Sequence, residues 1–235
     1  MPATVADCER SQTEWNCAVA VAGGGAVWED AGLHWAWQPH NRHLMLNFPR
    51  TIDPAAAQRG IEFARTHGAR TVGAWLSQDT DATALEASGF DRGWEPWWMA
   101  APLDAIAEPN DLRAALSTDV PEYGPEGQAL LTLARGTQSR AWHAVARLEG
   151  RLAGRAWCLV ADGVAGIYDM DVWPGFQRRG LGRALLRVVC DAARKAGATT
   201  AVLNATPDGE RLYSSEGFVR IGEGITYWHH VAAAG

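Results

Sequence analysis

The sequence predicts a mixed α/β (α+β) fold made of two similar units, each a mixed central sheet flanked by helices. Two observations support this prediction: strand-like and helix-like segments alternate along the chain, and two segments of the first half reappear in the second. The composition, with 47% hydrophobic and 20% charged residues, is typical of a folded globular chain. A length of 235 residues leaves room for one large domain or two small ones.

The internal repeat consists of a helix end that closes on a glycine and, further on, a Gly-Phe pair. Residues 64–69 resemble residues 193–198, and residues 87–90 resemble residues 215–218. The copies lie at nearly the same separation and an aromatic strand follows each, which favours duplication of one unit. The alternative is that such helix–Gly–strand connections simply occur in any α/β chain. We place the seam in the proline-containing stretch 102–111, so that the domains are residues 1–105 and 106–235.

In the first half, β-branched and aromatic runs predict three strands, and helix-start signals predict two helices. The strands are expected at residues 43–48, 71–76 and 94–101, and the helices at residues 53–67 and 81–88. Pro54 is well placed in the first turn of its helix, because proline has no N–H to leave unpaired.

In the second half, four strands alternate with turns and with two helix starts. The strands are expected at residues 141–148, 151–160, 164–172 and 199–204. The helix at residues 180–196 carries apolar side chains at every third or fourth position, which is typical of one core-facing stripe, and Gly197 ends it. Thr206 and Pro207 are suited to begin the last helix.

The composition also excludes classes of function. Acidic residues outnumber basic ones by 27 to 21, and the net charge of −6 argues against nucleic-acid binding through a basic field. The four cysteines are at neither redox-motif nor metal-ligand spacing, so we expect free thiols, a cytoplasmic location and no metal site. The N-terminus lacks a signal-peptide pattern, and no apolar stretch is long enough to cross a membrane.

The chemistry is concentrated in residues 172–184, where a strand ends, a loop follows and a helix begins at Gly180 and Gly182. A helix N-terminus presents unpaired N–H groups and a partial positive charge, and glycines allow a ligand to approach the backbone closely. Arg178, Arg179 and Arg183 add positive charge there. The pattern predicts a pyrophosphate cradle. It is neither a P-loop nor a Rossmann fingerprint, because it lacks the lysine motif of the first and the glycine spacing of the second.

Residues 177–182, Gln-Arg-Arg-Gly-Leu-Gly, resemble the Gln/Arg-x-x-Gly-x-Gly/Ala acyl-CoA signature of the GNAT acyltransferase superfamily. Residues 212–218, Leu-Tyr-Ser-Ser-Glu-Gly-Phe, resemble the family's Leu-Tyr-x-x-x-Gly-Phe motif. The resemblance is specific over about residues 141–228 and only structural over the first half. It implies an N-acetyltransferase that moves an acetyl group from acetyl-CoA to a primary amine by direct attack in a ternary complex.

The resemblance also implies roles for individual residues. In GNAT proteins the strand before the signature splays from its neighbour, so Asp171 and Val172 would pair with pantetheine and the Val172 N–H would polarise the thioester carbonyl. Asn204 resembles a polar position beside the cofactor, and Tyr213 resembles the general acid that protonates the leaving thiolate. The residues expected to bind the cofactor through the signature are Gln177, Arg178, Arg179, Gly180, Leu181, Gly182 and Arg183.

The general base is less defined. Family bases often occupy the positions of Gly166 and Tyr168, and neither is a carboxylate here. Asp169 and Asp171 alternate onto the other face of an ideal strand, although a β-bulge could turn one back. We take Asp169 as the candidate base; the alternative is a structural carboxylate paired with an arginine or the backbone. Thr206 stands where the family often has Asn, which weakens one cofactor contact but keeps the helix cap.

The first half has no glycine at residues 48–53, which correspond to the cradle, so we expect a degenerate copy that no longer binds CoA. Two other functions stay open: an acyltransferase that uses another acyl-CoA or aminoacyl-tRNA, and a CoA-binding sensor without turnover. We expect a small-molecule or peptide amine as acceptor, no nucleic-acid or membrane partner, and a monomer or homodimer.

Overall fold

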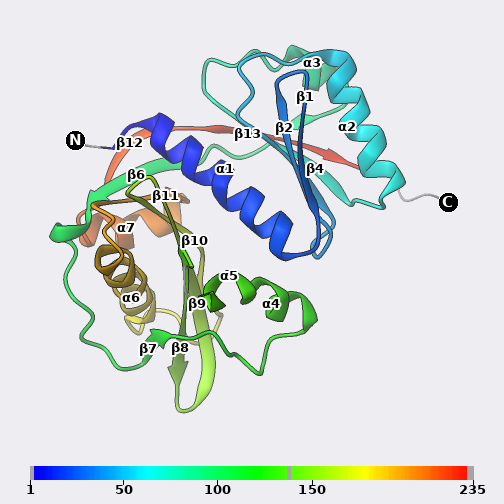
Figure 1. The fold of residues 1–235 in the computed structure, drawn as a ribbon. Coiled ribbons are helices and arrows are strands. Elements are labelled where there is room, and N and C mark those ends of the chain that lie inside the picture. Colours follow the sequence, from blue (N-terminus) through cyan, green and yellow to red (C-terminus); the bar gives the residue numbers. More distant parts are fainter. Residues whose placement is uncertain (1–2, 137–138, 232–235) are drawn as a thin grey trace. The chain divides into compact units, whose positions relative to one another are not determined.

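The computed structural model describes residues 3–136 and 139–231 and divides them into two compact units. Unit 1 consists of the residues up to Ser11 together with Trp97–Gly222, and unit 2 consists of Gln12–Pro96 together with the residues from Glu223 onward. Each unit has a mixed sheet with helices, as the sequence predicts, and each is described by itself (Figure 1).

Unit 1 contains a seven-stranded sheet in the order β12-β6-β11-β10-β9-β8-β7. Its strands are β6 (Trp97–Pro102), β7 (Ala114–Leu116), β8 (Ala141–Leu148), β9 (Arg151–Ala161), β10 (Val164–Val172), β11 (Thr200–Ala205) and β12 (Val219–Glu223). Its helices are the 3₁₀ turn η1 (Leu103–Ala105), α4 (Pro125–Leu130), α5 (Thr132–Arg135), α6 (Leu181–Lys195) and α7 (Pro207–Ser215). Strands β10 and β11 are parallel, whereas β6 pairs antiparallel with β11, β8 with β9, and β9 with β10.

Helix α6 packs against β8, β9 and β10 and covers one face of this sheet, with α4 and α5 on the other side (Figure 1). The apolar stripe expected from the sequence is buried: Leu181 and Leu185 are 1% and 0% exposed. Burying each leucine contributes about 1.5–3 kcal/mol, so this stripe fixes the helix on the sheet. Gly197 follows the helix with φ +91°, the left-handed conformation that ends many helices. The start of α6 is therefore held in place by the core.

Unit 2 contains a six-stranded sheet in the order β1-β2-β3-β4-β13-β5. Its strands are β1 (Ala26–Asp30), β2 (Leu33–Gln38), β3 (His43–Asn47), β4 (Thr71–Leu76), β5 (Asp91–Arg92) and β13 (Ile225–His230), and its helices are α2 (Pro54–Thr66) and α3 (Thr83–Ala87). Strands β3 and β4 are parallel and α2 connects them, just as α6 connects the parallel pair of unit 1. This correspondence matches the repeat found in the sequence.

The boundaries of the units differ from the expected domains 1–105 and 106–235, because the halves exchange one strand each. Strand β6 comes from the first half of the chain, yet it lies between β11 and β12 in the sheet of unit 1. Strand β13 comes from the second half, yet it lies between β4 and β5 in the sheet of unit 2. Local sequence patterns predict strands but not which sheet a strand joins, so this exchange was not anticipated.

Helix α1 (Val5–Ala22) was also not anticipated. Several of its buried side chains are polar, so the helix lacks the apolar periodicity that reveals most helices. Asn16 donates to the Asn47 amide oxygen at 2.7 Å, and Gln12 donates to Asn16 at 3.2 Å.

Among the described residues, no helix is long and apolar enough to cross a membrane. All four cysteines are unpaired, as expected, and Cys158 and Cys190 are buried.

The exchanged strand gives a test with two fragments. Residues 97–222 retain β6, whereas residues 106–235 lack it and leave β11 and β12 without the strand between them. Because β6 pairs with β11 along its whole length and buries Trp98 and Met99, we expect cooperative thermal unfolding only for 97–222, as followed by circular dichroism. A cooperative transition in 106–235 would contradict the strand assignment.

Candidate active site

The site begins where β10 separates from β11. The parallel pairing of the two strands covers Val164 to Ile167 on β10 and ends at Leu203 on β11, while β10 continues beside β9 to Val172. The Trp173 N–H donates to the Ala153 carbonyl at 3.0 Å. Successive N–H groups of a strand point to opposite sides, so the Val172 N–H and carbonyl face away from β9, into the opening. Figure 1 shows both strands in unit 1.

The residues expected to pair with pantetheine border this opening. The Val172 carbonyl accepts a hydrogen bond from Gln177 Nε2 at 2.9 Å, so the first residue of the signature ties the loop to the end of β10. Within the described residues, no group accepts a hydrogen bond from the Val172 N–H. Asp171 lies opposite Arg155 in the pairing of β10 with β9. Asn204 is half-buried and directly follows the last residue of β11 that pairs with β10.

A β-bulge interrupts β10 between Tyr168 and Asp171. Asp169 has φ +46°, a left-handed conformation that is strained for a residue with a side chain. The bulge turns Asp169 toward Arg155 on β9, whose Nη2 lies 2.9 Å from each carboxylate oxygen. Desolvation raises the pKa of Asp169, and the Arg155 cation opposes that rise. The carboxylate therefore lies on the face of the sheet opposite α6, which an ideal alternation would not have given.

Neither residue at the positions often used by family bases is available for that role. The Tyr168 side chain is buried, and its hydroxyl lies 2.5 Å from Ser11 Oγ. A Cβ on Gly166 would lie 2.1 Å from the Tyr168 hydroxyl oxygen, so that position has no room for a side chain. Of the two candidate carboxylates, Asp169 and Asp171, Asp169 is the one that the bulge turns to the other face of the sheet.

The N-terminus of α6 forms an open cradle. Gly180 precedes the helix with φ +81°, and no side chain caps it. Arg178 is also left-handed, with φ +62°. Within the described residues, the backbone N–H groups from Gln177 to Arg183 have no hydrogen-bond acceptor. A Cβ on Gly182 would lie 3.0 Å from Leu212 Cδ2, so a side chain at this position would crowd Leu212. These features fit a phosphate-bearing ligand.

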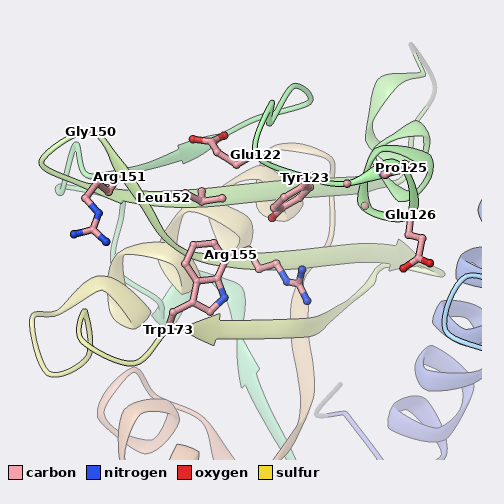
Figure 2. Close-up of a pocket in the computed structure, with 11 residues that line it drawn as sticks. Glu122, Tyr123, Pro125, Glu126, Gly150, Arg151, Leu152, Arg155 and Trp173 are labelled. Atoms are coloured by element: carbon pink, nitrogen blue, oxygen red, sulfur yellow. The ribbon is translucent and has the colours of Figure 1, made fainter.

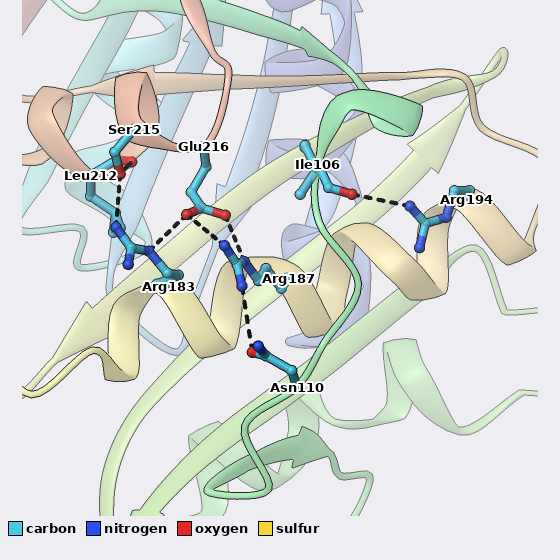
Figure 3. Close-up of polar contacts among 8 residues, drawn as sticks. All are labelled: Ile106, Asn110, Arg183, Arg187, Arg194, Leu212, Ser215 and Glu216. Carbon is cyan, nitrogen blue, oxygen red and sulfur yellow. Dashed lines mark hydrogen bonds and ion pairs between the residues drawn. The ribbon is translucent and has the colours of Figure 1, made fainter.

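The arginines around the cradle divide into two groups. Arg183 and Arg187 both bind Glu216, with 2.7 Å between each Nε and a carboxylate oxygen, and Arg183 also donates to Ser215 (Figure 3). Glu216 is buried, so this ion pair fixes the end of α7 against α6. The Arg183 guanidinium is thus engaged with α7, and only its backbone N–H is left for the cradle.

Arg178 and Arg179 are exposed, and within the described residues neither side chain forms an ion pair. The Arg179 carbonyl accepts from Arg113, which the Asp111 carboxylate holds in place. Sequence reasoning missed Arg113 and Glu216. The four-residue spacing of Arg183 and Arg187 on one helix face was the available signal for a shared acidic partner.

Tyr213 lies on α7, in the core cluster of unit 1. Its ring meets Phe218 edge to face at 5.9 Å, which links both ends of the second motif. Burial raises the pKa of Tyr213 to about 12, so the phenol stays protonated through the neutral range. Leu212, its neighbour, contacts the cradle position Gly182. The second motif therefore lies beside the first, as a shared ligand requires.

A pocket of about 860 Å³ opens on the face of unit 1 that carries Arg155 (Figure 2). Tyr123 forms one wall, and its hydroxyl donates to His143 Nε2 at 3.0 Å, while His143 Nδ1 donates to the Ser117 carbonyl at 2.9 Å. Desolvation lowers the pKa of His143 to about 4, so the ring is neutral and this tautomer is fixed. Both ring nitrogens of His143 are thus hydrogen-bonded. No pattern in the sequence singled out Tyr123 or Arg155.

Unit 2 lacks both features of this site. Its parallel strands β3 and β4 stay paired from His43 to Asn47, and the Phe48 N–H continues the pairing by donating to the Trp75 carbonyl at 2.8 Å. The N-terminus of α2 is capped by Asp53, whose carboxylate accepts from the Ala56 N–H at 2.8 Å. A carboxylate already occupies the place where a phosphate would bind, which supports a degenerate copy.

Across residues 3–136 and 139–231, no cluster of three His, Cys, Asp or Glu could hold a metal ion.

Comparison with known proteins gives one family match and several similar folds. Residues 110–218 match the model of the acetyltransferase (GNAT) family. The fold is similar to a GCN5-related N-acetyltransferase from Kribbella flavida, with TM-score 0.61 and 18% identity over 97% of this chain and 96% of the other. It is also similar to a putative GNAT acetyltransferase from Novosphingobium aromaticivorans, with TM-score 0.61 and 16% identity over 96% and 99% of the two chains.

A tandem GNAT protein from the clavulanic acid biosynthesis pathway is similar along the whole chain. Its TM-score is 0.55 and its identity 14%, with 100% of this chain and 99% of the other covered. The similarity therefore extends over both units. No curated protein is similar enough to this chain to count as a match.

Proposed function

We propose that the chain is an acyltransferase that moves an acetyl group from acetyl-CoA to a primary amine, because its residues 110–218 match the model of the acetyltransferase (GNAT) family. The observation that carries the proposal is the open edge of β10 beside the uncapped start of α6. One element supplies a free N–H at Val172 and the other supplies a row of free N–H groups. Acetyl-CoA carries a thioester and a pyrophosphate on one flexible arm. The thioester would accept from the strand N–H, and the pyrophosphate would accept from the N–H groups at the helix start.

The donor would bind through the backbone. The N–H groups of residues 178–183 would hold the pyrophosphate at the positive end of α6, and the exposed Arg178 and Arg179 would add positive charge. The pantetheine arm would lie along the free edge of β10 at Asp171 and Val172, with Asn204 on the opposite strand. The Val172 N–H would donate to the thioester oxygen and stabilise the negative charge that develops there.

The chain also supplies groups that can move protons. In the transfer, the amine nitrogen forms a bond to the carbonyl carbon and the carbon–sulfur bond breaks. Asp169 would take the proton that the amine loses, because the bulge turns this carboxylate to the face of the sheet opposite α6, beside Arg155. Tyr213, protonated at neutral pH, would give a proton to the sulfur as it leaves. The products are an amide and free CoA.

Gly182→Glu tests the donor site. The new side chain would contact Leu212 and bring a negative charge to the cradle, so acetyl-CoA should no longer bind. For the unchanged protein, acetyl-CoA at about 100 times its Kd adds roughly 2.7 kcal/mol and raises Tm by several degrees in a thermal-shift measurement. Ala55→Glu is the matched control, because it adds the same charge at an exposed position near the start of α2, the corresponding helix of unit 2. A Tm shift that survives in Gly182→Glu would place the donor elsewhere.

Asp169→Asn tests the base through the pH dependence of CoA release. Asp169 acts as a base only when ionised, so kcat/KM should fall as the pH drops through its raised pKa. Because Asn cannot ionise, kcat/KM of the variant should no longer fall at acidic pH, and it should be lower by about 10²-fold. Tyr213→Phe is the comparison variant. Its kcat/KM should be lower at every pH, and it should still fall as the pH drops through the pKa of Asp169. An unchanged profile in Asp169→Asn would assign the carboxylate a structural role beside Arg155.

A further inference from the structure

The pocket on the Arg155 face is built from three segments of unit 1. These are the turn that leads into α4, the start of β9, and Trp173, which directly follows Val172 (Figure 2). Its volume of about 860 Å³ is within the range of small-molecule sites. Arg155 lines the pocket and also binds Asp169. The pocket is therefore lined by the arginine that binds Asp169, the carboxylate that would activate an acceptor amine.

Most charges that line the pocket are already paired. Glu122 accepts from both Nη1 and Nη2 of Arg147, at 2.5 and 3.0 Å, and this bidentate contact lowers the pKa of Glu122 to about 2. Arg155 is paired with Asp169. These groups neutralise each other and leave little demand for a charged ligand.

Two charged side chains are left over, one of each sign. Within the described residues, neither Glu126 nor Arg151 forms an ion pair or a hydrogen bond. The Arg151 guanidinium lies 5.3 Å from the centre of the Phe176 ring, a contact that orients the cation without neutralising it. Figure 2 shows the two side chains at opposite ends of the pocket, with Tyr123, Arg155 and Trp173 between them.

The middle of the pocket presents aromatic and aliphatic side chains beside the Arg155 guanidinium. Tyr123 is locked by its bond to His143, and its ring faces the Arg155 guanidinium at 5.9 Å. Leu152 and Trp173 add apolar surface. A ligand that fits has an apolar body and opposite charges at its two ends. A polyamine would meet the uncompensated Arg151, and a simple alkylamine would leave that cation without a partner.

We propose that this pocket binds the acceptor, and that the acceptor is a small amine that carries an acidic group, carboxylate or phosphate, at its far end. Arg151 binds the acidic group, and the amine lies toward Glu126 and Asp169. The inference rests on the proposed acetyl transfer and names the class of its acceptor.

The test compares amines that share one body. CoA release is measured with pentylamine, 5-aminopentanoate and 5-aminopentyl phosphate, for the unchanged protein and for Arg151→Gln. The unchanged protein should have a kcat/KM at least about tenfold higher for one of the acidic amines. Arg151→Gln should lower that value by about 10- to 100-fold, as expected for loss of a charge-assisted contact, and change the pentylamine value less than about twofold. Whichever acidic compound responds identifies carboxylate or phosphate.

Arg65→Gln is the matched control, because Arg65 is an exposed arginine on α2 of unit 2 whose one ion pair is local, to Glu62. It should leave all three values unchanged. A preference for pentylamine, or an equal effect of Arg151→Gln on all three amines, would overturn the inference while acetyl transfer stands. If no amine releases CoA, the proposed function fails. Calorimetric binding of the acidic amines to the unchanged protein and to Arg151→Gln then decides the inference on its own, since equal binding to both refutes it.

Discussion

Between Tyr168 and Val172, strand β10 stays beside β9 but has left β11. This separation is the constraint on which the candidate site depends, because a fully paired strand has no free N–H to offer. The bulge at Asp169 lies in the same segment and turns a carboxylate toward Arg155. Strain in the backbone and open hydrogen-bonding groups thus coincide over a few residues, as is common at functional sites. The core behind them, which fixes α6, keeps this arrangement in place.

Unit 2 has the same strand–helix–strand connection, but its parallel strands do not separate. Its parallel pair remains joined as far as Phe48, and Asp53 caps the helix that follows. Both differences close the site. The continued pairing of β3 with β4 occupies the hydrogen-bonding groups of the strand edge, and the Asp53 cap places a negative charge at the helix start. The duplicated unit keeps the sheet and the helix order. The exchange of β6 and β13 means that each half of the chain also completes the sheet of the other unit.

Much of the fold could be predicted from the sequence, since periodicity revealed α6 and turn residues revealed β8, β9 and β10. The cradle could be predicted because Gly180 and Gly182 mark a helix start that a ligand can approach. The strand exchange could not, because sheet membership depends on contacts distant in sequence. Helix α1 was missed because part of its buried face is polar. Pairings such as Glu216 with Arg187 arise only when α6 and α7 are brought together.

The central claim is that one unit of the chain, and only one, has a site for acetyl-CoA. Isothermal titration calorimetry of the full chain measures the number of sites directly. The account predicts one equivalent of acetyl-CoA per chain, because unit 1 has the open strand edge and the uncapped helix, whereas unit 2 has neither. Two equivalents per chain would show that the paired strands and the Asp53 cap do not close unit 2. No binding would contradict the site in unit 1.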